Sequence, residues 1–431
     1  MRKKVRIKKK RKVYYVSPYM PEGEGYEKHY SVAAQSKVGY IRSLFKKEEL
    51  ITVCVNCSLT VDNLIILPKI VSDENGKCRV VCSISCVNRL FLPFCGLIMY
   101  FSLFMYLFLN VRKQDTIVLY HSIYYDMIAY IIKKIRKCKI IYEVEEVYAD
   151  VRDGGMGREE EIRKCRKMAD AFIFPTELLN KEININNIPY LIVYGAYLIP
   201  NNKVMKKVNK EKIRIVYSGT LMEGKGAEEV VECAKYLDEK YEIRIIGYGR
   251  DEEIEKLLNR IANIESKCVV HFDGVKYGNE YMDYLMKCDI GLCIQPLHNL
   301  FNKSSFPSKV LSYFNAGLKI ITNEIPAVVQ SRLSKYIPFA HSAEPMEVAR
   351  AIKESEKMFL YGNDLVEALD REAKTEMRIL LHDLYKEFYD SQEFLYAFKG
   401  NFNRNENGQV TVKDDAVFYK VNNRVRKVLS I

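Results

Sequence analysis

The sequence predicts an α/β protein built from two doubly wound, Rossmann-like domains. The chain has 431 residues, more than one hydrophobic core usually holds. In both halves short apolar strands alternate with helical stretches, which is the pattern of a parallel sheet covered by helices. A polar, basic segment without clear periodicity separates the halves, so we expect a ligand site in a central cleft that the two domains face.

The first domain is predicted over residues 13–198. Residues 12–17 form an aromatic and β-branched strand, a loop with proline and two glycines follows, and residues 31–45 have a helical pattern. Helical stretches also separate several of the later apolar strands. These strands are predicted at Leu50–Val55, Cys78–Ser83, Thr116–His121, Lys139–Glu143 and Ala171–Pro175.

The second domain is predicted over residues 212–376, after a linker at residues 199–211. A helical run from Met377 then leads into a polar tail that ends at residue 431. The strands of the second domain read IRIVYSG, YEIRIIG, CVVHFDG, DIGLCIQ and LKIITN in chain order.

The net charge of +12 is concentrated at the start of the chain, where nine of the first twelve residues are lysine or arginine. Residues 1–12 are therefore treated as a basic arm. Such an arm can contact anionic lipid, since each basic residue near a charged bilayer contributes about 1 kcal/mol, or it can be a solvated terminus. We expect no nucleic acid as a partner, because no basic surface interleaved with aromatic residues recurs elsewhere.

An uncharged apolar helix is predicted at residues 90–109, between Arg89 and Arg112. It is long enough to span a bilayer, but a span would place strands of one sheet on opposite sides of the membrane. We therefore predict a helix of the first domain that is partly buried and partly touches an anionic membrane surface. A true span and a simple core helix remain the alternatives.

Twelve cysteines in a chain of this length do not form a disulfide framework, and the first residues lack the apolar core of a signal peptide. These features favour the cytoplasm. Cys54 and Cys57 are spaced like half of a zinc site, but Cys54 lies in a predicted strand and no matching second pair follows. We therefore expect no metal ion, and buried or idle thiols instead.

Glycines follow two strands of the second domain, and a lysine accompanies the first of these turns. The stretch YSGTLMEGKG ends a strand at Gly219 and places Lys225 just before a helix, an arrangement that lets backbone and a cation approach a phosphate. Gly247 and Gly249 follow the next strand. Each turn alone is weak evidence, because strand-to-helix turns often carry such residues for structural reasons.

The stretch FNKSSFPSKVLSYFNAGLKIIT predicts a helix that begins at Pro307–Lys309 and ends at Gly317. Lys309 then lies near the positive end of the helix, which is unfavourable for a cation unless an anion joins it. The alternative is a lysine that points into water.

In their order and spacing, SGTL, KG, IIGYG, HFDG, CDIGL, SSFPSK and NAGLKII resemble the group 1 retaining glycosyltransferases of GT-B fold. The resemblance implies a nucleotide-diphosphate sugar held mainly by the second domain. Its diphosphate would lie near Gly219, Lys225 and the Ser308–Lys309 turn. The other donor-binding positions that the resemblance implies are Gly23, Gly25, Thr220, Gly247, Gly249 and Ser312.

The resemblance also implies a mechanism and a setting. His121 falls at the family's frequent active-site histidine, although a lone histidine after a strand is more often structural. With Lys225 and Lys309 as the other catalytic groups, we expect a hexosyltransferase-type reaction with retention and with no metal ion or cofactor. The acceptor would be a saccharide or a lipid-linked saccharide of surface polysaccharide or glycoconjugate synthesis, at the inner face of the membrane. The last helix would return to the first domain.

Three departures from the family pattern weaken the prediction of efficient catalysis. Ser304 and Ser312 stand where members carry a pair of glutamates, and Thr220 stands where many carry arginine. A catalytically weak or inactive subunit that binds a nucleotide sugar or a partner transferase is therefore one alternative, and a nucleotide-sugar epimerase of the same fold is another. Glu146, in the YEVEEVYAD stretch, is a candidate acceptor contact or part of a solvated acidic loop.

Overall fold

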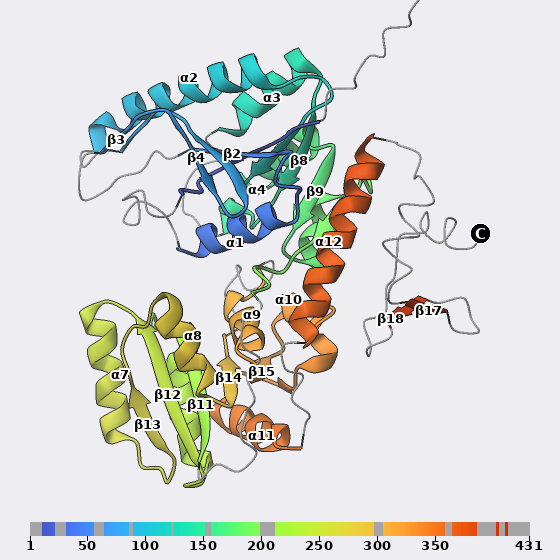
Figure 1. Cartoon of the computed structure of the whole chain (residues 1–431). Helices are drawn as coiled ribbons and strands as arrows, with labels where there is room; N and C mark the ends of the chain where they lie inside the picture. The colour runs from blue at the N-terminus through green and yellow to red at the C-terminus, as the bar shows by residue number, and fades with distance from the viewer. Residues whose placement is uncertain are drawn as a thin grey trace, which may run out of the picture. The chain divides into compact units, whose positions relative to one another are not determined.

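The computed structural model describes residues 11–21, 32–55, 64–85, 89–121, 125–150, 157–198, 212–296, 305–357, 364–385, 402–404 and 410–412. The chain divides into two compact units, Met1–Met377 and Arg378–Ile431. Both large sheets belong to the first unit (Figure 1). In the second unit the structure describes the last turns of a long helix and the antiparallel pair β17 (Phe402–Arg404) and β18 (Val410–Val412).

The first sheet has eight strands in the order β10-β9-β8-β7-β1-β2-β5-β4. All neighbours pair in parallel except β4, an edge strand that runs antiparallel to β5. Every residue of β1 and β9 is buried, because helices cover both faces of a parallel sheet. Its strands are β1 (Val13–Ser17), β2 (Leu50–Cys54), β4 (Lys69–Asp73), β5 (Gly76–Val80), β7 (Thr116–Tyr120), β8 (Lys139–Glu143), β9 (Ala171–Phe174) and β10 (Tyr190–Ile192).

Five α-helices accompany the first sheet, and β3 pairs with β6 in a small antiparallel ladder within the described residues. Figure 1 shows α2 and α3 side by side over one side of this sheet, and the two helices contact each other. The elements are α1 (Val32–Ser43), β3 (Leu64–Ile66), β6 (Ser83–Ser85), α2 (Leu92–Asn110), α3 (Asp126–Arg136), α4 (Arg158–Met168) and α5 (Glu177–Ile183), with short 3-10 turns η2 (Arg89–Phe91) and η3 (Tyr148–Asp150).

The second sheet has six parallel strands in the order β13-β12-β11-β14-β15-β16. Counted from β11, this is the order 3-2-1-4-5-6 of a doubly wound nucleotide-binding fold. The strands are β11 (Ile213–Thr220), β12 (Tyr241–Tyr248), β13 (Val269–Phe272), β14 (Ile290–Cys293), β15 (Lys319–Asn323) and β16 (Phe339–Ala340).

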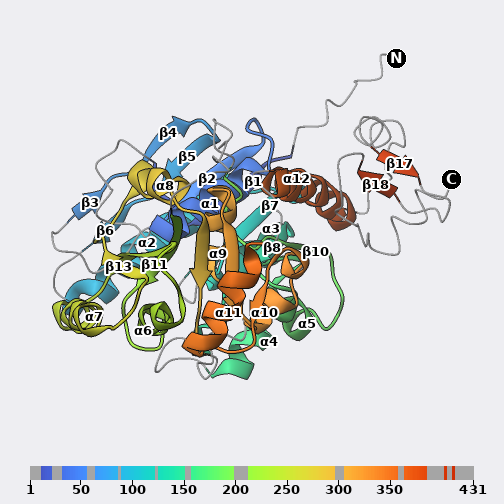
Figure 2. The same cartoon turned by 90° about the horizontal axis from the view of Figure 1, so that it is seen from below.

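One face of the second sheet packs against α6, α7 and α11, where Val230, Leu257 and Ile352 join the buried core. Figure 2 shows α6 and α7 side by side at this face. The helices of this part are α6 (Ala227–Glu232), α7 (Asp251–Asn263), α8 (Gly278–Met286), α9 (Ser308–Asn315), α10 (Pro326–Val329), α11 (Pro345–Ser355) and α12 (Asp364–Tyr385), with 3-10 turns η4 (Cys233–Tyr236) and η6 (Ser334–Tyr336).

The predicted α/β class with two doubly wound sheets is confirmed. The edge strands β4, β10 and β16 were not predicted from the sequence. The last helix was predicted to start at Met377, whereas α12 begins at Asp364. Short edge strands carry little of the apolar pattern that identifies a strand from sequence. The predicted linker at 199–211 lies outside the described residues, so the domain boundaries and the central cleft stay predictions.

Candidate functional site

The second sheet has a switch point between β11 and β14, where the strand order reverses. In open parallel sheets, ligands bind beyond the carboxyl ends of the strands at such a point. Gly219 lies at the carboxyl end of β11, and α9, which follows β14 in the chain, begins at Ser308. The topology therefore brings together two segments that are nearly ninety residues apart in the sequence.

Lys309 reaches back from the first turn of α9 to the end of β11. Its Nζ lies 4.0 Å from the centre of the Tyr217 ring, and a Cβ placed on Gly219 would be 3.1 Å from the same Nζ. Burial lowers the pKa of Lys309. Within the part of the chain that the structure describes, no carboxylate forms an ion pair with this lysine. A partly buried cation without a carboxylate partner is costly on its own and favours a bound anion.

Lys225 adds a second positive charge to the same turn. Burial and the nearby charge of Lys309 lower the pKa of Lys225. The turn is held by the Tyr217 hydroxyl, which lies 2.7 Å from the carbonyl oxygen of Lys225 and 3.1 Å from that of Thr220. The two lysines bring two positive charges to one glycine turn, and such a turn favours a bound diphosphate.

Gly247 supports the turn from the neighbouring strand. Its φ is +156°, and a Cβ on it would lie 1.8 Å from the carbonyl oxygen of Gly219. No other residue fits there without moving β11 away from β12. Gly249 follows at the end of β12, where a Cβ would be 2.9 Å from a carboxylate oxygen of Glu253. Gly247 thus shapes the predicted donor site by positioning Gly219.

Two tyrosines that were not predicted from the sequence hold the end of β11. Tyr313 of α9 accepts a hydrogen bond from the backbone N–H of Ser218 at 2.9 Å and donates to the carbonyl oxygen of Leu292 at 3.1 Å. The Ser218 hydroxyl lies 3.0 Å from the hydroxyl of Tyr281 in α8. A lone tyrosine in an amphipathic helix carries no sequence signal for such a role, so only the folded structure identifies it.

The predicted ribose side of the site is less complete than the phosphate side. The Ser312 hydroxyl bonds within its own helix, 3.4 Å from the carbonyl oxygen of Ser308. Ser308 is exposed, and Thr220 is partly buried at the end of β11. Ser304 lies outside the described residues. The roles of these residues in donor binding stay predictions.

The first sheet also has a switch point, between β1 and β7, and His121 lies directly beyond β7. His121 is 2% exposed, its ring stacks on Tyr148 at 4.5 Å, and its Nε2 lies 3.2 Å from Glu161 Oε1. Among the described residues its Nδ1 has no hydrogen-bond partner. The contacts support a structural role, and the catalytic role stays a prediction. Gly23 and Gly25, predicted beside the same switch point, lie outside the described residues.

The glutamates at the end of β8 and just after it lie in different environments. Glu143 is fully buried beside Tyr15, which donates a hydrogen bond to it, and burial raises the pKa of Glu143 well above its usual range. Glu145 lies 3.5 Å from Lys37 Nζ. Glu146 is partly exposed, and its predicted acceptor contact stays a prediction. Both faces of β8 are covered, so Glu143 at the end of this strand is buried whichever face it points to.

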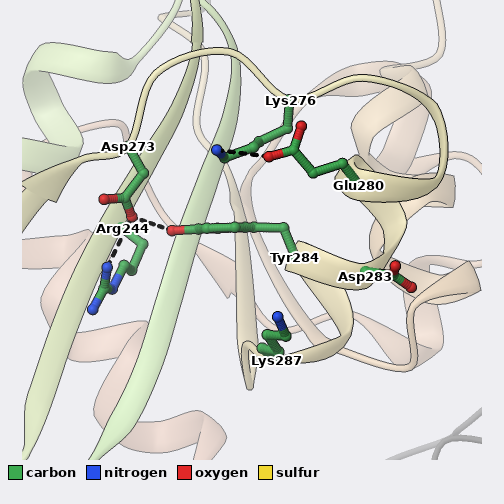
Figure 3. A pocket seen from close by; sticks show the side chains of 7 residues that line it. All are labelled: Arg244, Asp273, Lys276, Glu280, Asp283, Tyr284 and Lys287. Carbon is green, nitrogen blue, oxygen red and sulfur yellow. Dashed lines mark hydrogen bonds and ion pairs between the residues drawn. The ribbon is translucent and has the colours of Figure 1, made fainter.

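A cavity of about 530 Å³ lies at α8 and contains none of the predicted site residues (Figure 3). Arg244 pairs with Asp273 at 2.9 Å, Tyr284 donates a hydrogen bond to the same carboxylate, and Lys276 pairs with Glu280 at 2.9 Å. Most of its charges are thus already neutralised. Its lining residues are Arg244, Asp273, Lys276, Glu280, Asp283, Tyr284 and Lys287.

No group of three or more histidine, cysteine or acidic side chains suited to a metal ion occurs among the described residues. Cys54 is buried in β2, and Cys57 lies outside the described part.

No family model and no curated protein match the sequence. Solved structures match nearly the whole chain. A trehalose-6-phosphate protein from E. coli, bound with UDP-2-fluoro glucose, has a TM-score of 0.60 at 11% identity over 88% of this chain and 99% of that chain. The α,α-trehalose-phosphate synthase (UDP-forming) of Burkholderia xenovorans, in complex with glucose-6-phosphate, has a TM-score of 0.53 at 11% identity over 91% and 100%. HepE of Anabaena, in complex with UDP and glucose, has 0.54 at 8% identity over 88% and 99%. At these identities the similarity establishes the fold alone.

Proposed function

We propose that this chain, which has the GT-B fold, transfers a sugar from a nucleotide-diphosphate sugar to a saccharide or a lipid-linked acceptor. The observation that carries the proposal is the pair of lysines, Lys225 and Lys309, at the glycine turn after β11. Their mutual repulsion is relieved when a diphosphate binds between them. The three solved structures named above hold UDP, a UDP-sugar analogue or a sugar phosphate, which makes UDP-sugars the first donors to test.

The proposed chemistry is stabilisation of the leaving group. As the bond between the sugar and the diphosphate breaks, negative charge grows on the diphosphate oxygens, and the two ammonium groups stabilise this charge. The acceptor hydroxyl then attacks the anomeric carbon from the face that the diphosphate leaves, with retention, and its proton passes to a phosphate oxygen of the leaving diphosphate. Correct positioning of donor and acceptor would supply much of the remaining rate acceleration.

The proposed setting is the cytoplasmic face of a membrane, in the synthesis of surface polysaccharide or glycoconjugate. The basic arm at residues 1–12 and the apolar helix α2 motivate this part of the proposal. A lipid-linked acceptor would be reached most directly by a protein held at that surface.

The proposal is tested by incubating the purified chain with a panel of nucleotide sugars and measuring release of the nucleoside diphosphate, with and without membrane extract as acceptor. Lys309→Ala should reduce turnover at least about 100-fold, a loss of about 3 kcal/mol typical of a transition-state charge contact. The matched control is Lys267→Ala. Lys267 is exposed and precedes β13, so it lies at the amino-terminal ends of the strands, away from the carboxyl ends where the proposed site lies. Equal turnover in both variants would refute the assigned site.

A second candidate is a subunit that binds the nucleotide sugar without transferring it. The observation that favours it is the Ser312 hydroxyl, which bonds to its own helix where the family pattern has a glutamate. This candidate predicts calorimetric binding of a UDP-sugar with no product under any acceptor condition. Restoring the acidic side chain with Ser312→Glu should then strengthen nucleotide binding.

A further inference from the structure

Helix α2 and its neighbour α3 present a broad apolar surface to solvent. In η2 and α2 the side chains of Phe91, Phe94, Leu97, Phe101 and Leu109 are 61–69% exposed, and Leu90 is 85% exposed. On α3, Met127, Ile131 and Ile135 recur every fourth residue and are 40–53% exposed. We call these nine residues the α2/α3 face. An exposed apolar surface of this extent on a folded domain marks an interaction site.

The buried side of α2 shows that the helix is packed as part of the domain. Cys95, Met99, Leu103 and Leu107, four residues apart, are all buried. The segment Pro93–Asn110 is long and apolar enough to cross a membrane, with a mean hydropathy of 1.6, and 28% of it is buried. The helix is therefore apolar on both sides, although only one side is covered by protein among the described residues.

Strand pairing argues against α2 crossing a bilayer. β1 pairs with β2 on one side and with β7 on the other, so that Val13 lies opposite both Leu50 and Thr116. β2 precedes α2 in the chain and β7 follows it. The strands before and after α2 therefore lie in one sheet, on one side of any membrane. The helix can then enter a bilayer only while it lies parallel to the membrane plane.

The charges around the α2/α3 face have one sign. Arg112 and Lys113 are exposed directly after α2, and Lys134 and Lys137 are exposed at the end of α3. The single acidic residue within the two helices, Asp126, is buried and pairs with Lys164 at 2.8 Å. An apolar surface bordered by lysine and arginine complements a bilayer that contains anionic lipid.

We propose that the α2/α3 face is a membrane-docking surface that lies in the interfacial region of an anionic bilayer, with α2 parallel to the membrane plane. The inference deepens the proposed function, on which its membrane setting rests, by naming the surface that docks. The apolar side chains enter the headgroup and acyl boundary, and the four basic residues contact lipid phosphates.

The test is co-flotation of the full chain with vesicles of phosphatidylcholine alone or with about 30% phosphatidylglycerol, the anionic share at which basic surfaces gain affinity. Wild type should bind the anionic vesicles. The triple variant Phe94→Ser, Leu97→Ser, Phe101→Ser should bind at least about tenfold more weakly, since partial burial of three large side chains is worth more than a tenfold change. The double variant Lys134→Glu, Lys137→Glu should lose the preference for anionic lipid.

The matched control replaces three other exposed large apolar residues, which lie in the helices and loops of the second sheet: Leu258→Ser, Tyr277→Ser and Met346→Ser. It should bind vesicles as wild type does. Three outcomes would overturn the proposal: no binding by wild type, equal binding by the Phe94 triple variant and wild type, or a wild-type dimer that the triple variant converts to a monomer. A variant that lacks residues 2–10 tests the contribution of the basic arm. If this deletion abolishes vesicle binding while the triple variant binds as wild type does, the proposal is also overturned.

Nucleotide binding in solution is measured on the same preparations. If a variant loses vesicle binding and keeps UDP-sugar binding, the docking surface is isolated from the donor site. If the chain binds vesicles but no nucleotide sugar, the proposed function fails and the docking surface stands.

Discussion

The Nε2 of His121 lies 3.2 Å from Oε1 of Glu161, and both side chains are buried. Glu161 also accepts hydrogen bonds from the backbone N–H groups of Tyr148 and Ala149, at 2.8 and 3.1 Å. Burial alone would raise the pKa of Glu161, but the bonds from His121 and the two N–H groups outweigh it, so its pKa lies below the usual range. The pair thus joins the end of β7 to α4.

Removing this carboxylate should destabilise the fold. Glu161→Ala leaves His121 and two N–H groups without their acceptor, and we expect a loss of about 3 kcal/mol in the free energy of unfolding. Because the folded pKa is lowered, the stabilisation is complete above the unfolded pKa of about 4.3 and is lost as the pH falls through the folded value. Urea unfolding at neutral and acidic pH measures both effects. Glu160→Ala, at an exposed position of the same helix, should change stability little, and an equal loss in both variants would contradict the assignment.

Gly247 should tolerate no side chain. Gly247→Ala forces a Cβ against the carbonyl oxygen of Gly219, and we expect a loss of at least about 2 kcal/mol together with weaker donor binding. Gly39→Ala is the matched control, because Gly39 lies in α1 and a Cβ there would contact the Tyr19 ring at 4.0 Å. That variant should gain about 0.5–1 kcal/mol. Chemical denaturation of both proteins checks the opposite signs.

Donor binding should take up protons above neutral pH. The pKa values of Lys309 and Lys225 are lowered in the free protein, and a bound diphosphate would raise them again. Affinity for UDP should therefore fall as the pH rises from 7 toward the ordinary lysine value of about 10.4. Calorimetry in two buffers with different ionisation enthalpies measures the uptake directly. Identical enthalpies in the two buffers at every pH would contradict a role for either lysine.

A buried carboxylate on α12 should make stability depend on pH near neutrality. Glu372 is 2% exposed and bonds to Arg332, and burial raises its pKa to about 7. Since the folded pKa is raised, the folded state holds its proton more tightly than the unfolded state. The free energy of unfolding should therefore fall as the pH rises from about 4.3 to 7, by at most about 3 kcal/mol.

The matched pair for this effect is Glu372→Gln and Glu367→Gln, on the same helix. The first substitution should flatten the pH profile of the unfolding midpoint, and the second, at a partly exposed position, should leave the profile unchanged. A wild-type profile that is flat between pH 5 and 7 would show that Glu372 ionises normally.

The sequence predicted the sheets well because buried parallel strands are continuous apolar runs, as in β1, β9 and β14. It also identified Gly219 and Lys309 separately, and the strand order of the second sheet explains why they meet. The antiparallel edge strand β4 was missed because it is short and no residue in it is fully buried, so its sequence lacks the apolar pattern of a core strand.

Side-chain pairing could not be predicted from the sequence. The contact of His121 with Glu161 joins residues forty positions apart, and no local pattern encodes it. The sequence predicted that α2 is partly exposed but not which of its residues are exposed, because the sequence of an apolar helix does not show which side other elements cover. The contribution of α3 to the α2/α3 face became evident only in the folded structure.

The most direct test of the central claim, that Lys225 and Lys309 bind the diphosphate of a nucleotide sugar, is calorimetric titration with UDP-glucose and the other UDP-sugars. Wild type should bind at least one of them, Lys309→Ala should bind it about 10–100-fold more weakly, as expected for loss of a charge-assisted hydrogen bond, and Lys267→Ala should match wild type. Equal affinity of wild type and Lys309→Ala for every nucleotide sugar that binds would contradict the claim, as would the absence of binding to the entire panel.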